Sequence, residues 1–376
     1  MKSMSLMNAR IDRRRLVVAA SGAMIAAPFL GRGLSVAAQD GSGVTVTMVT
    51  DTAGIGDQGF NDLANKGGTE AASEFGVKFS VIESQTAADY VPNLTQGAEG
   101  GDLTAAIGFL LTDAMTEVAP TYPDARFMIL DAVVEGDNIS SVTFKENEGT
   151  FLAGVLAALT TKTNKIGFVG GIRIPPVLRY EVGYVAGARS INPDIEIQIA
   201  YADNFEDPAL GKELALAQFN QGCDVLQQAA GRTGVGLFDA AKEKGAGFWV
   251  ISGDADQAHL GPEIQLAAVQ KGIDTAVKLV IQEVVEDKFK PGIQNLGIKE
   301  GGMDLIAYNT AVTAEIKSVV DAYKSAISDG TVIVPDSDDA AKTFKPVPPS
   351  ELGLSASPAA SPVASPEASP EASPVS

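Results

Sequence analysis

Residues 50–62, with the sequence TDTAGIGDQGFND, decide how the rest of the chain is interpreted. They contain Gly54-x-Gly56-x-x-Gly59, which has the glycine spacing of dinucleotide-binding loops. The apolar run VTVTMVT before them predicts a strand, and the residues after them predict a helix. The stretch therefore indicates a strand–turn–helix unit and leaves its use open between a cofactor loop and a ligand-binding loop.

A cofactor loop requires that the first glycine follow the strand almost directly, with the diphosphate on the helix N-terminus. Here three residues separate the strand from Gly54, and Asp51 and Asp57 would place carboxylates beside the diphosphate. Glu83, at the end of the next predicted strand, does stand near the position of a ribose-binding acid. An exported NAD(P)-dependent oxidoreductase using this loop is therefore one alternative, without a convincing Lys/His pair for proton transfer.

The binding interpretation uses the same geometry without a phosphate. Asp51 can accept hydrogen bonds from hydroxyls or a base N–H, Phe60 offers a flat apolar face, and the Asn61 amide can donate and accept. A planar, uncharged ligand with polar edges would suit this trio. The same residues also fit a purely structural role, with Phe60 in the core and Asn61 as a helix N-cap.

Short apolar runs alternate with helical patterns between residues 44 and 336. The predicted strands are 44–49, 77–82, 105–109, 127–130, 142–144, 166–169, 195–200, 224–228, 248–251 and 304–308, and predicted helices include 148–159, 210–220 and 275–285. This alternation predicts an α/β protein with parallel sheets, and the number of strands favours two doubly wound lobes.

Ligands of such sheets bind outside the carboxyl ends of the strands. The residues at predicted strand ends are Asp51, residues 109–113, Asp131, Gly170 and Gly171, residues 201–205, Gly231 and Asp254. If two lobes face each other, these residues line one cleft whose walls are acidic and aromatic rather than basic.

Composition excludes several classes of function. The formal net charge of the 376-residue chain is -19, which is unfavourable for nucleic-acid binding. One cysteine, Cys223, excludes an internal disulfide and a cysteine-rich metal site, and we expect it to be buried. The only histidine, His259, has no nucleophile pattern around it, and we expect a surface position. We therefore expect no enzyme, no cofactor and no metal; the clusters GDADQ and PDSDDA lack the spacing of a calcium-dependent nucleoside hydrolase.

Both ends of the chain have a composition unlike the middle. Residues 1–38 combine Arg13, Arg14 and Arg15 with an apolar run that is too short to span a bilayer, which predicts a twin-arginine-like signal peptide cleaved near Ala38. No cysteine stands near that point, so we expect export without an N-terminal lipid anchor, to the periplasm or cell surface. Residues 336–376 are rich in Ser, Pro and Ala and predict a disordered tail.

Many segments in order resemble one family. DTAGIGDQGFNDLANKG, SQTAADYVPNL, SSVTFKENEGTFLAGVLAAL, IGFVGGIRIPPVLRYEVGYVAGA and SGDADQ are similar to motifs of the basic membrane protein family of substrate-binding proteins. The resemblance covers nearly all of residues 44–334. It implies the type I periplasmic-binding-protein fold, two Rossmann-like lobes joined by three crossings, and delivery of a nucleoside, often a purine one, to a membrane ABC permease.

The resemblance also implies boundaries and a site. Lobe 1 would comprise residues 44–140 and 256–290, lobe 2 residues 141–255 and 291–335, with crossings near 139–144, 252–256 and 288–295. We expect a monomer. The implied ligand-binding residues are Asp51, Phe60, Asn61, Asp113, Asp131, Phe205, Gly231, Asp254 and Lys271.

Each of these residues has an implied role. Phe60 and Phe205 would sandwich the base, while Asp51 and Asn61 bind polar edges of the ligand. Asp254 would accept from ribose hydroxyls, Lys271 would donate to them, and Gly231 would present its backbone N–H. Asp113 and Asp131 both qualify as a further acidic contact, with the spacing favouring Asp131.

The sequence departs from the family pattern at three positions. Gly59 replaces a usual serine, Asn65 a usual aromatic residue, and Arg232 a usual glycine. Arg232 would either add a positive charge near the mouth of the pocket or point to solvent. Because these changes lie near the implied site, a different small polar ligand is a second alternative.

Overall fold

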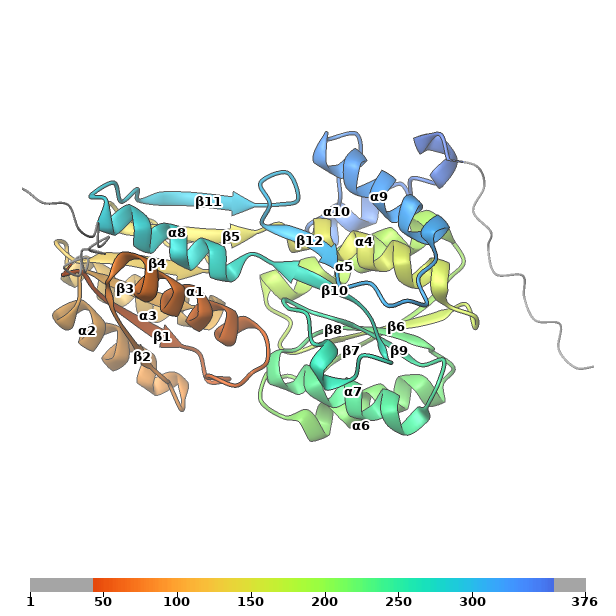
Figure 1. The fold of residues 1–376 in the computed structure, drawn as a ribbon, viewed down its shortest axis with the longest axis horizontal. Helices are drawn as coiled ribbons and strands as arrows, with labels where there is room; N and C mark the ends of the chain where they lie inside the picture. The colour runs from red at the N-terminus through yellow and green to blue at the C-terminus, as the bar shows by residue number, and fades with distance from the viewer. Residues whose placement is uncertain (1–42, 355–376) are drawn as a thin grey trace, which may run out of the picture. The chain divides into compact units, whose positions relative to one another are not determined.

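The computed structural model describes residues 43–354. The expected signal peptide, residues 1–38, and residues 355–376 of the expected tail lie outside this range. The described chain forms two α/β lobes, each built on a six-stranded sheet (Figure 1). None of the helices within residues 43–354 combines the length and the apolar character needed to cross a membrane.

The first lobe is organised by a fully parallel sheet in the order β11-β5-β4-β3-β1-β2. Its strands are β1 (Thr45–Thr50), β2 (Lys78–Ile82), β3 (Leu103–Ile107), β4 (Arg126–Leu130), β5 (Ile139–Phe144) and β11 (Gly292–Leu296). Every residue of β3 is buried, whereas exposed and partly buried residues mix along β2 at the edge. Central strands of a parallel sheet carry helices on both faces, which explains their continuous apolar runs.

The second lobe repeats this plan. Its sheet has the order β12-β10-β9-β8-β6-β7, and only the β10–β12 pair is antiparallel. The strands are β6 (Lys165–Gly170), β7 (Glu196–Tyr201), β8 (Val225–Ala229), β9 (Trp249–Ser252), β10 (Gln265–Lys271) and β12 (Met303–Ile306).

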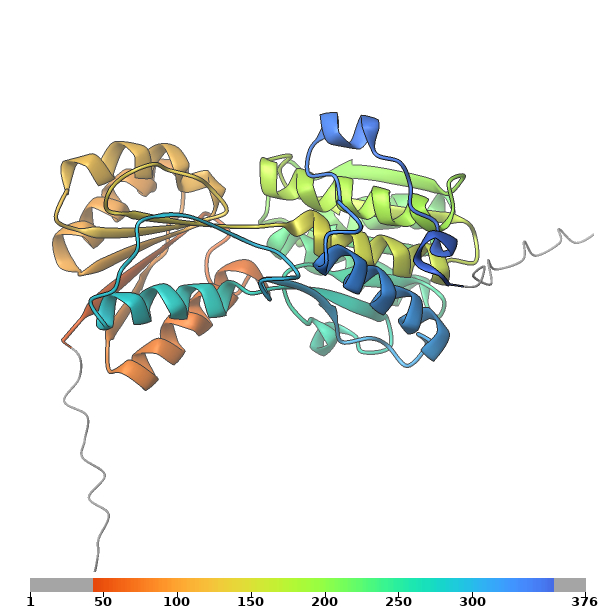
Figure 2. The same ribbon diagram turned by 90° about the horizontal axis from the view of Figure 1, so that it is seen from above.

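Helices cover both faces of each sheet (Figure 2). In the first lobe α1 (Phe60–Phe75) and α8 (Ile273–Val285) lie side by side on one face, and α2 (Tyr90–Gly100) and α3 (Thr112–Val118) on the other. In the second lobe α4 (Glu146–Thr160), α5 (Pro175–Ile191) and α9 (Ala314–Ser328) lie on one face, and α6 (Pro208–Asn220) and α7 (Val235–Lys244) on the other. The α8 helix buries Ile273, Val277, Val280, Ile281 and Val284, the spacing of one helical stripe.

The strand orders explain where a ligand can bind. In each sheet the chain starts at an inner strand, moves outward once, and then returns to build the other side. The direction reverses between β1 and β3 in the first sheet and between β6 and β8 in the second. Open parallel sheets bind ligands outside the carboxyl ends of the strands at such a reversal. The fold thus supplies two binding edges.

The expected lobe boundaries require correction. The chain passes between the sheets at Lys145, at Gly272 and at residues 297–302. Residues 141–144 and 292–296 are in strands of the first sheet, not parts of lobe 2. Residues 256–271 are not part of lobe 1, because they lead into and form β10 of the second sheet. The expected crossing at 252–256 is therefore wrong. The sequence pattern gives the wrong lobe boundaries because it does not predict β10 and β11 as strands. The β11 strand is polar and lies at an exposed edge of its sheet.

The tail also begins later than expected. Residues 336–354 are ordered: α10 (Asp338–Thr343) packs on α5, and the turn η6 (Pro349–Leu352) packs on α9. Phe344 lies edge-on to Phe151, with ring centroids 6.3 Å apart, and Tyr323 donates a hydrogen bond to the Val347 carbonyl at 2.6 Å. The composition predicts disorder here because most residues of the segment are polar or proline, but Phe344 and Val347 make specific contacts with the second lobe.

Candidate functional site

One pocket lies where the carboxyl ends of both sheets meet. It encloses about 560 Å³ of empty space, part of it open to solvent. Its walls are Asp51, Ala53, Asp57, Phe60, Asn61, Gly108, Phe109, Leu110, Asp131, Ile174, Pro176, Val177, Tyr180, Phe205, Ala229, Gly231, Asp254 and Lys271. Residues after β1, β3, β6 and β8 all contribute, so both reversal points face the same space.

Most of the residues expected from the sequence line this pocket. They are Asp51, Phe60, Asn61, Asp131, Phe205, Gly231, Asp254 and Lys271. Asp113 is different: it lies exposed in the first turn of α3 and is not part of the pocket wall. Of the two acidic residues expected as a further contact, only Asp131, which directly follows β4, lines the pocket.

Two acidic side chains of the pocket sit in an unusual backbone conformation. Asp131 has φ 64° and Asp254 has φ 63°, both in the left-handed region. For a residue other than glycine this conformation costs about 1–3 kcal/mol. Strained conformations of this kind cluster at functional sites. Here they follow the ends of two strands and direct the two carboxylates into the pocket.

The first wall is a hydrogen-bonded trio of Asp51, Asp57 and Asn61. The Asn61 Nδ2 group donates to Asp51 Oδ1 at 2.9 Å and to Asp57 Oδ2 at 3.1 Å. Because both partners are carboxylates, the amide orientation is fixed, and the buried Asn61 Oδ1 has no partner among the described residues. Burial raises the pKa of Asp51 to about 6, against the lowering effect of Asn61 and with added repulsion from Asp57.

Most backbone N–H groups of the loop before α1 already have a carboxylate partner and are not available to a diphosphate. Carboxylates of the same lobe accept the backbone N–H groups of Ile55, Gly56, Gln58, Gly59, Asn61 and Asp62. Glu83, the candidate ribose acid, is one of these acceptors: its Oε2 lies 3.0 Å from the Ile55 nitrogen. The N-terminus of α1, where a dinucleotide would place its phosphates, is already occupied by Asp57. This geometry disfavours the cofactor alternative.

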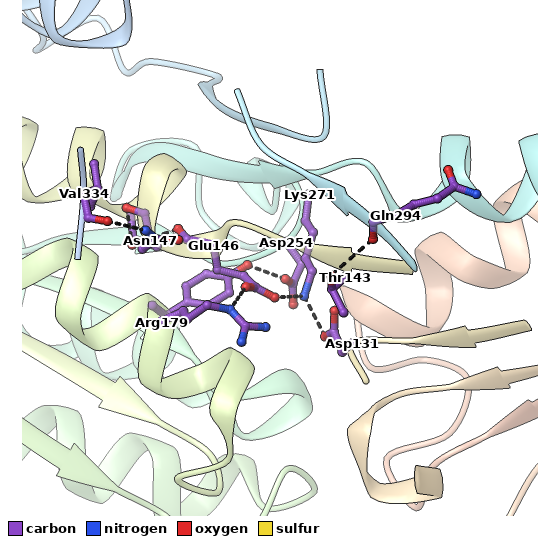
Figure 3. A network of polar contacts seen from close by, with 11 residues as sticks. Asp131, Thr143, Glu146, Asn147, Arg179, Asp254, Lys271, Gln294 and Val334 are labelled. Atoms are coloured by element: carbon purple, nitrogen blue, oxygen red, sulfur yellow. Dashed lines mark hydrogen bonds and ion pairs between the residues drawn. The ribbon is translucent and has the colours of Figure 1, made fainter. Parts of the chain in front are cut away.

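Lys271 is the cation of the pocket and is almost fully buried (Figure 3). Its Nζ lies 2.6 Å from Asp131 Oδ2, which belongs to the first lobe, and 2.9 Å from Glu146 Oε1 on α4. Arg179 on α5 donates to the other oxygen of Glu146 at 2.5 Å. Figure 3 shows Lys271 between these carboxylates, with Asp254 close by. The ammonium therefore links the lobes at the inner end of the pocket.

Charge and burial act against each other in this cluster. Burial alone would lower the pKa of Lys271, but the carboxylates of Asp131, Glu146 and Asp254 outweigh it, and the pKa rises. Burial raises the pKa of Asp131 to about 6 although Lys271 opposes that rise. Burial likewise raises the pKa of Asp254. The pocket thus holds one firmly charged cation and several carboxylates that ionise with more difficulty than usual.

Two of the three phenyl rings that line the pocket, those of Phe60 and Phe205, come from opposite lobes. Phe60 begins α1, and its ring centroid is 5.2 Å from Lys271 Nζ. Phe205 follows β7 and lies so close to Gly171 that a Cβ there would come within 2.2 Å of the ring. At Gly231 an added Cβ would lie 3.3 Å from the Phe205 carbonyl oxygen, which is a tight contact but no overlap. Glycine at position 171 leaves room for the Phe205 ring, and position 231 favours glycine because its φ is 54°.

The predicted set of ligand-binding residues lacks two polar residues of the pocket, Asp57 and Tyr180. Tyr180 on α5 donates its hydroxyl to Asp254 Oδ1 at 2.5 Å, which orients that carboxylate. Its position, on the second turn of a helix that starts at Pro175, is not a strand end, so the strand-end rule does not find it. The two prolines predict the start of the helix, but no sequence signal directs Tyr180 to the pocket.

Taken together, the pocket offers aromatic rings from both lobes, several carboxylate and amide oxygens, and one ammonium group. Such walls accept hydrogen bonds from hydroxyl and N–H groups and pack against a flat apolar surface. They repel phosphates. No group of three or more His, Cys, Asp or Glu side chains within residues 43–354 is arranged to hold a metal ion.

Comparison with known proteins agrees with this picture. Residues 44–338 match the family model described as ABC transporter substrate-binding protein PnrA-like. The ABC transporter nucleoside-binding protein BmpA of Lactococcus lactis is 38% identical over 77% of this chain and 88% of its own length. Basic membrane protein A of Borreliella burgdorferi is 31% identical over 77% of this chain and 87% of its own.

A solved structure supports the fold in the same way. The ABC transporter solute-binding protein of Aeropyrum pernix superposes with a TM-score of 0.74 at 29% identity, covering 80% of this chain and 96% of that protein. The resemblance expected from the sequence motifs is confirmed, and so is the two-lobed α/β fold of type I. This chain belongs to the Bmp family of PnrA-like ABC transporter substrate-binding proteins.

Proposed function

We propose that this protein binds a nucleoside, most favourably a purine nucleoside, in the pocket between its lobes. The observation that carries the proposal is the placement of Phe60 and Phe205 from opposite lobes on one pocket whose polar groups are mostly acceptors. The base would stack on the rings, an interaction worth roughly 1–3 kcal/mol per base. The name of the Lactococcus relative supports the same ligand class.

The polar groups divide between the two halves of such a ligand. Asp51 and the free oxygen of Asn61 would accept from the N–H groups of the base. Asp254, oriented by Tyr180, would accept from ribose hydroxyls, and Lys271 would donate to their oxygens. Asp131 would hold Lys271 in place and provide a further acceptor. These are roles of binding, and the family consists of substrate-binding proteins rather than enzymes.

Membership of the family also gives the protein its setting. Substrate-binding proteins of ABC importers work outside the cytoplasm and hand their ligand to a membrane transporter. We propose that the chain acts as a monomer that delivers its nucleoside to the permease of such a transporter. Export through the basic segment at residues 13–15 belongs to the same proposal.

Isothermal titration of the purified protein with adenosine, guanosine and inosine, against a panel of sugars, tests the ligand class. The proposal predicts saturable one-to-one binding of purine nucleosides and no heat from the sugars. Binding of a sugar with no response to any nucleoside would contradict it. The same result would favour the remaining alternative, a receptor for another small polar ligand.

A further inference from the structure

Two glycines of the loop between β1 and α1, Gly54 and Gly56, do not line the pocket. Gly54 (φ 63°) and Gly56 (φ 87°) both adopt the left-handed conformation. The N–H groups of Ile55 and Gly56 turn inward to Glu83 and Asp62 of the same lobe. The carbonyl groups of Ala53 and Ile55 are therefore left to make contacts outside their own lobe.

Both carbonyl groups are bound by one side chain of the other lobe. Arg232 Nη2 donates to the Ala53 oxygen at 2.9 Å and to the Ile55 oxygen at 3.0 Å. Arg232 lies in the turn η4 (Gly231–Gly234), directly after β8 of the second sheet. Its neighbour Gly231 lines the pocket, as does Ala53, whereas Arg232 itself does not. The contact thus spans the rim of the pocket rather than its interior.

Two further contacts join the same loop to the second lobe. Gln257 Nε2 donates to the Gln58 carbonyl at 2.9 Å, and His259 Nε2 lies 2.8 Å from Gln58 Oε1. Gln257 is held in turn by Gln228, whose Nε2 donates to Gln257 Oε1 at 3.2 Å. Residues 53–58 are therefore bound at both ends to the other lobe, with Arg232 supplying the charged contact.

The strength of the Arg232 contact is limited by its own geometry. A hydrogen bond with a charged donor is stronger than a neutral one. The Nε group of Arg232, however, is buried without a partner among the described residues, and a buried unsatisfied donor is unfavourable. The favourable Nη2 bonds and the unfavourable Nε burial partly cancel, which suits a contact that must form and break in each cycle of binding and release.

We propose that Arg232 and residues 53–58 form a latch that holds the two lobes together over the bound ligand and sets the rate of ligand release. The glycine loop binds the guanidinium group of Arg232 rather than a phosphate, because its glycines turn two carbonyl groups toward that side chain. The identity of the ligand that the latch retains depends on the proposed function, whereas the contact between the lobes is independent of it. Arg232 is accordingly a positioning residue that touches no ligand.

Stopped-flow measurement of guanosine dissociation from the full-length protein tests the latch. Replacing Arg232→Gln removes the charge and shortens the side chain, so the dissociation rate constant should rise about tenfold or more while the association rate constant changes little. Arg232→Lys keeps the charge but not the planar guanidinium group, so its dissociation rate constant should lie between those of the unaltered protein and Arg232→Gln. Arg189→Gln, an exposed arginine on α5, is the matched control and should match the unaltered protein. Dissociation within twofold of the unaltered protein for Arg232→Gln would overturn the latch.

A second measurement keeps the test independent of the ligand. Spin labels at Glu117→Cys on α3 and Asp239→Cys on α7, in a Cys223→Ser background, report the distance between the lobes by pulsed electron resonance. Arg232→Gln should shift the distance distribution of the unliganded protein to longer values. Identical distributions would refute the latch even if guanosine binds. A protein that binds no nucleoside but shows the shift would refute the proposed ligand and keep the latch.

Discussion

At the scale of single residues, the rings of Phe60 and Phe205 distinguish a nucleoside site from a general polar pocket, because they provide surfaces on which a base can stack. Replacing either ring by alanine should weaken purine nucleoside binding by roughly 1–3 kcal/mol, about 5- to 150-fold, because the stacking surface is lost. Titration calorimetry measures the change. Phe75→Ala, at the other end of α1 and half-buried like Phe60, is the control that should lower stability without altering affinity. Unchanged affinity in both pocket variants would reject stacking.

The raised pKa of Asp51 predicts a pH dependence of binding. A ligand that donates hydrogen bonds to Asp51 favours the ionised carboxylate, so binding lowers a pKa that is about 6 in the empty pocket. Affinity should therefore rise as pH increases from 5 to 7, about tenfold for this one group, and level off above that.

Titrations of variants across this pH range separate the groups. Asp51→Asn should flatten the rise, and the slope that remains belongs to Asp131 and Asp254, because burial raises the pKa of both carboxyl groups. Asp113→Asn, exposed and outside the pocket, should keep the full slope. Affinity that falls between pH 5 and 7 would show that the ligand does not depend on ionised carboxylates.

Much of the pocket could be predicted from residues at strand ends. Asp51, Asp131 and Asp254 stand within three residues of the end of an apolar run, and the rule that ligands meet the carboxyl ends of parallel strands finds them without a structure. Asp113 follows a strand too, but the chain turns into α3 before reaching it, and the side chain faces solvent. The partners that orient the pocket, Tyr180 and Glu146, come from helices, where the sequence gives no comparable signal.

At the scale of elements, the cluster around Glu146 joins α4, α5 and β10 beside two of the three crossings. Glu146 is fully buried and neutralises both Lys271 and Arg179. Glu146→Gln keeps the shape and removes the charge, which should lower the free energy of unfolding by roughly 3 kcal/mol, because a buried cation loses a counter-charge. Urea denaturation measures this change.

A surface ion pair provides the comparison for that variant. Glu243→Gln breaks the exposed contact with Lys212 and should leave the denaturation midpoint nearly unchanged. Equal small effects of both substitutions would mean that the buried cluster does not stabilise the fold. The test also bears on the hinge, because Glu146 and Lys271 lie next to Lys145 and Gly272, where the chain passes between the lobes.

The elements that escaped prediction share a physical cause. The β11 strand is GIQNL and lies at the edge of its sheet, where one side needs no apolar partner. The β10 strand has polar residues at both ends, including Lys271, because its carboxyl end faces the pocket. Tertiary surroundings, rather than local pattern, make these segments strands.

At the scale of the whole molecule, the segment after the second sheet contributes to stability. Arg173 holds Asp338 at 2.8 Å, the Val347 nitrogen donates to Ser190 Oγ at 3.1 Å, and Phe344 covers Phe151. A chain ending at residue 335 should lose roughly 2–4 kcal/mol of unfolding free energy, because buried aromatic surface becomes exposed. A chain ending at Leu354 keeps all of these contacts and is the control. Equal midpoints for the two chains in urea would contradict the packing.

The most direct test of the nucleoside site is a crystal structure of the protein with guanosine. The account predicts the base between the rings of Phe60 and Phe205, an N–H group on Asn61 Oδ1, and ribose hydroxyls within hydrogen-bond distance of Asp254 and Lys271. Guanosine bound outside this pocket, or with its base away from both rings, would contradict it.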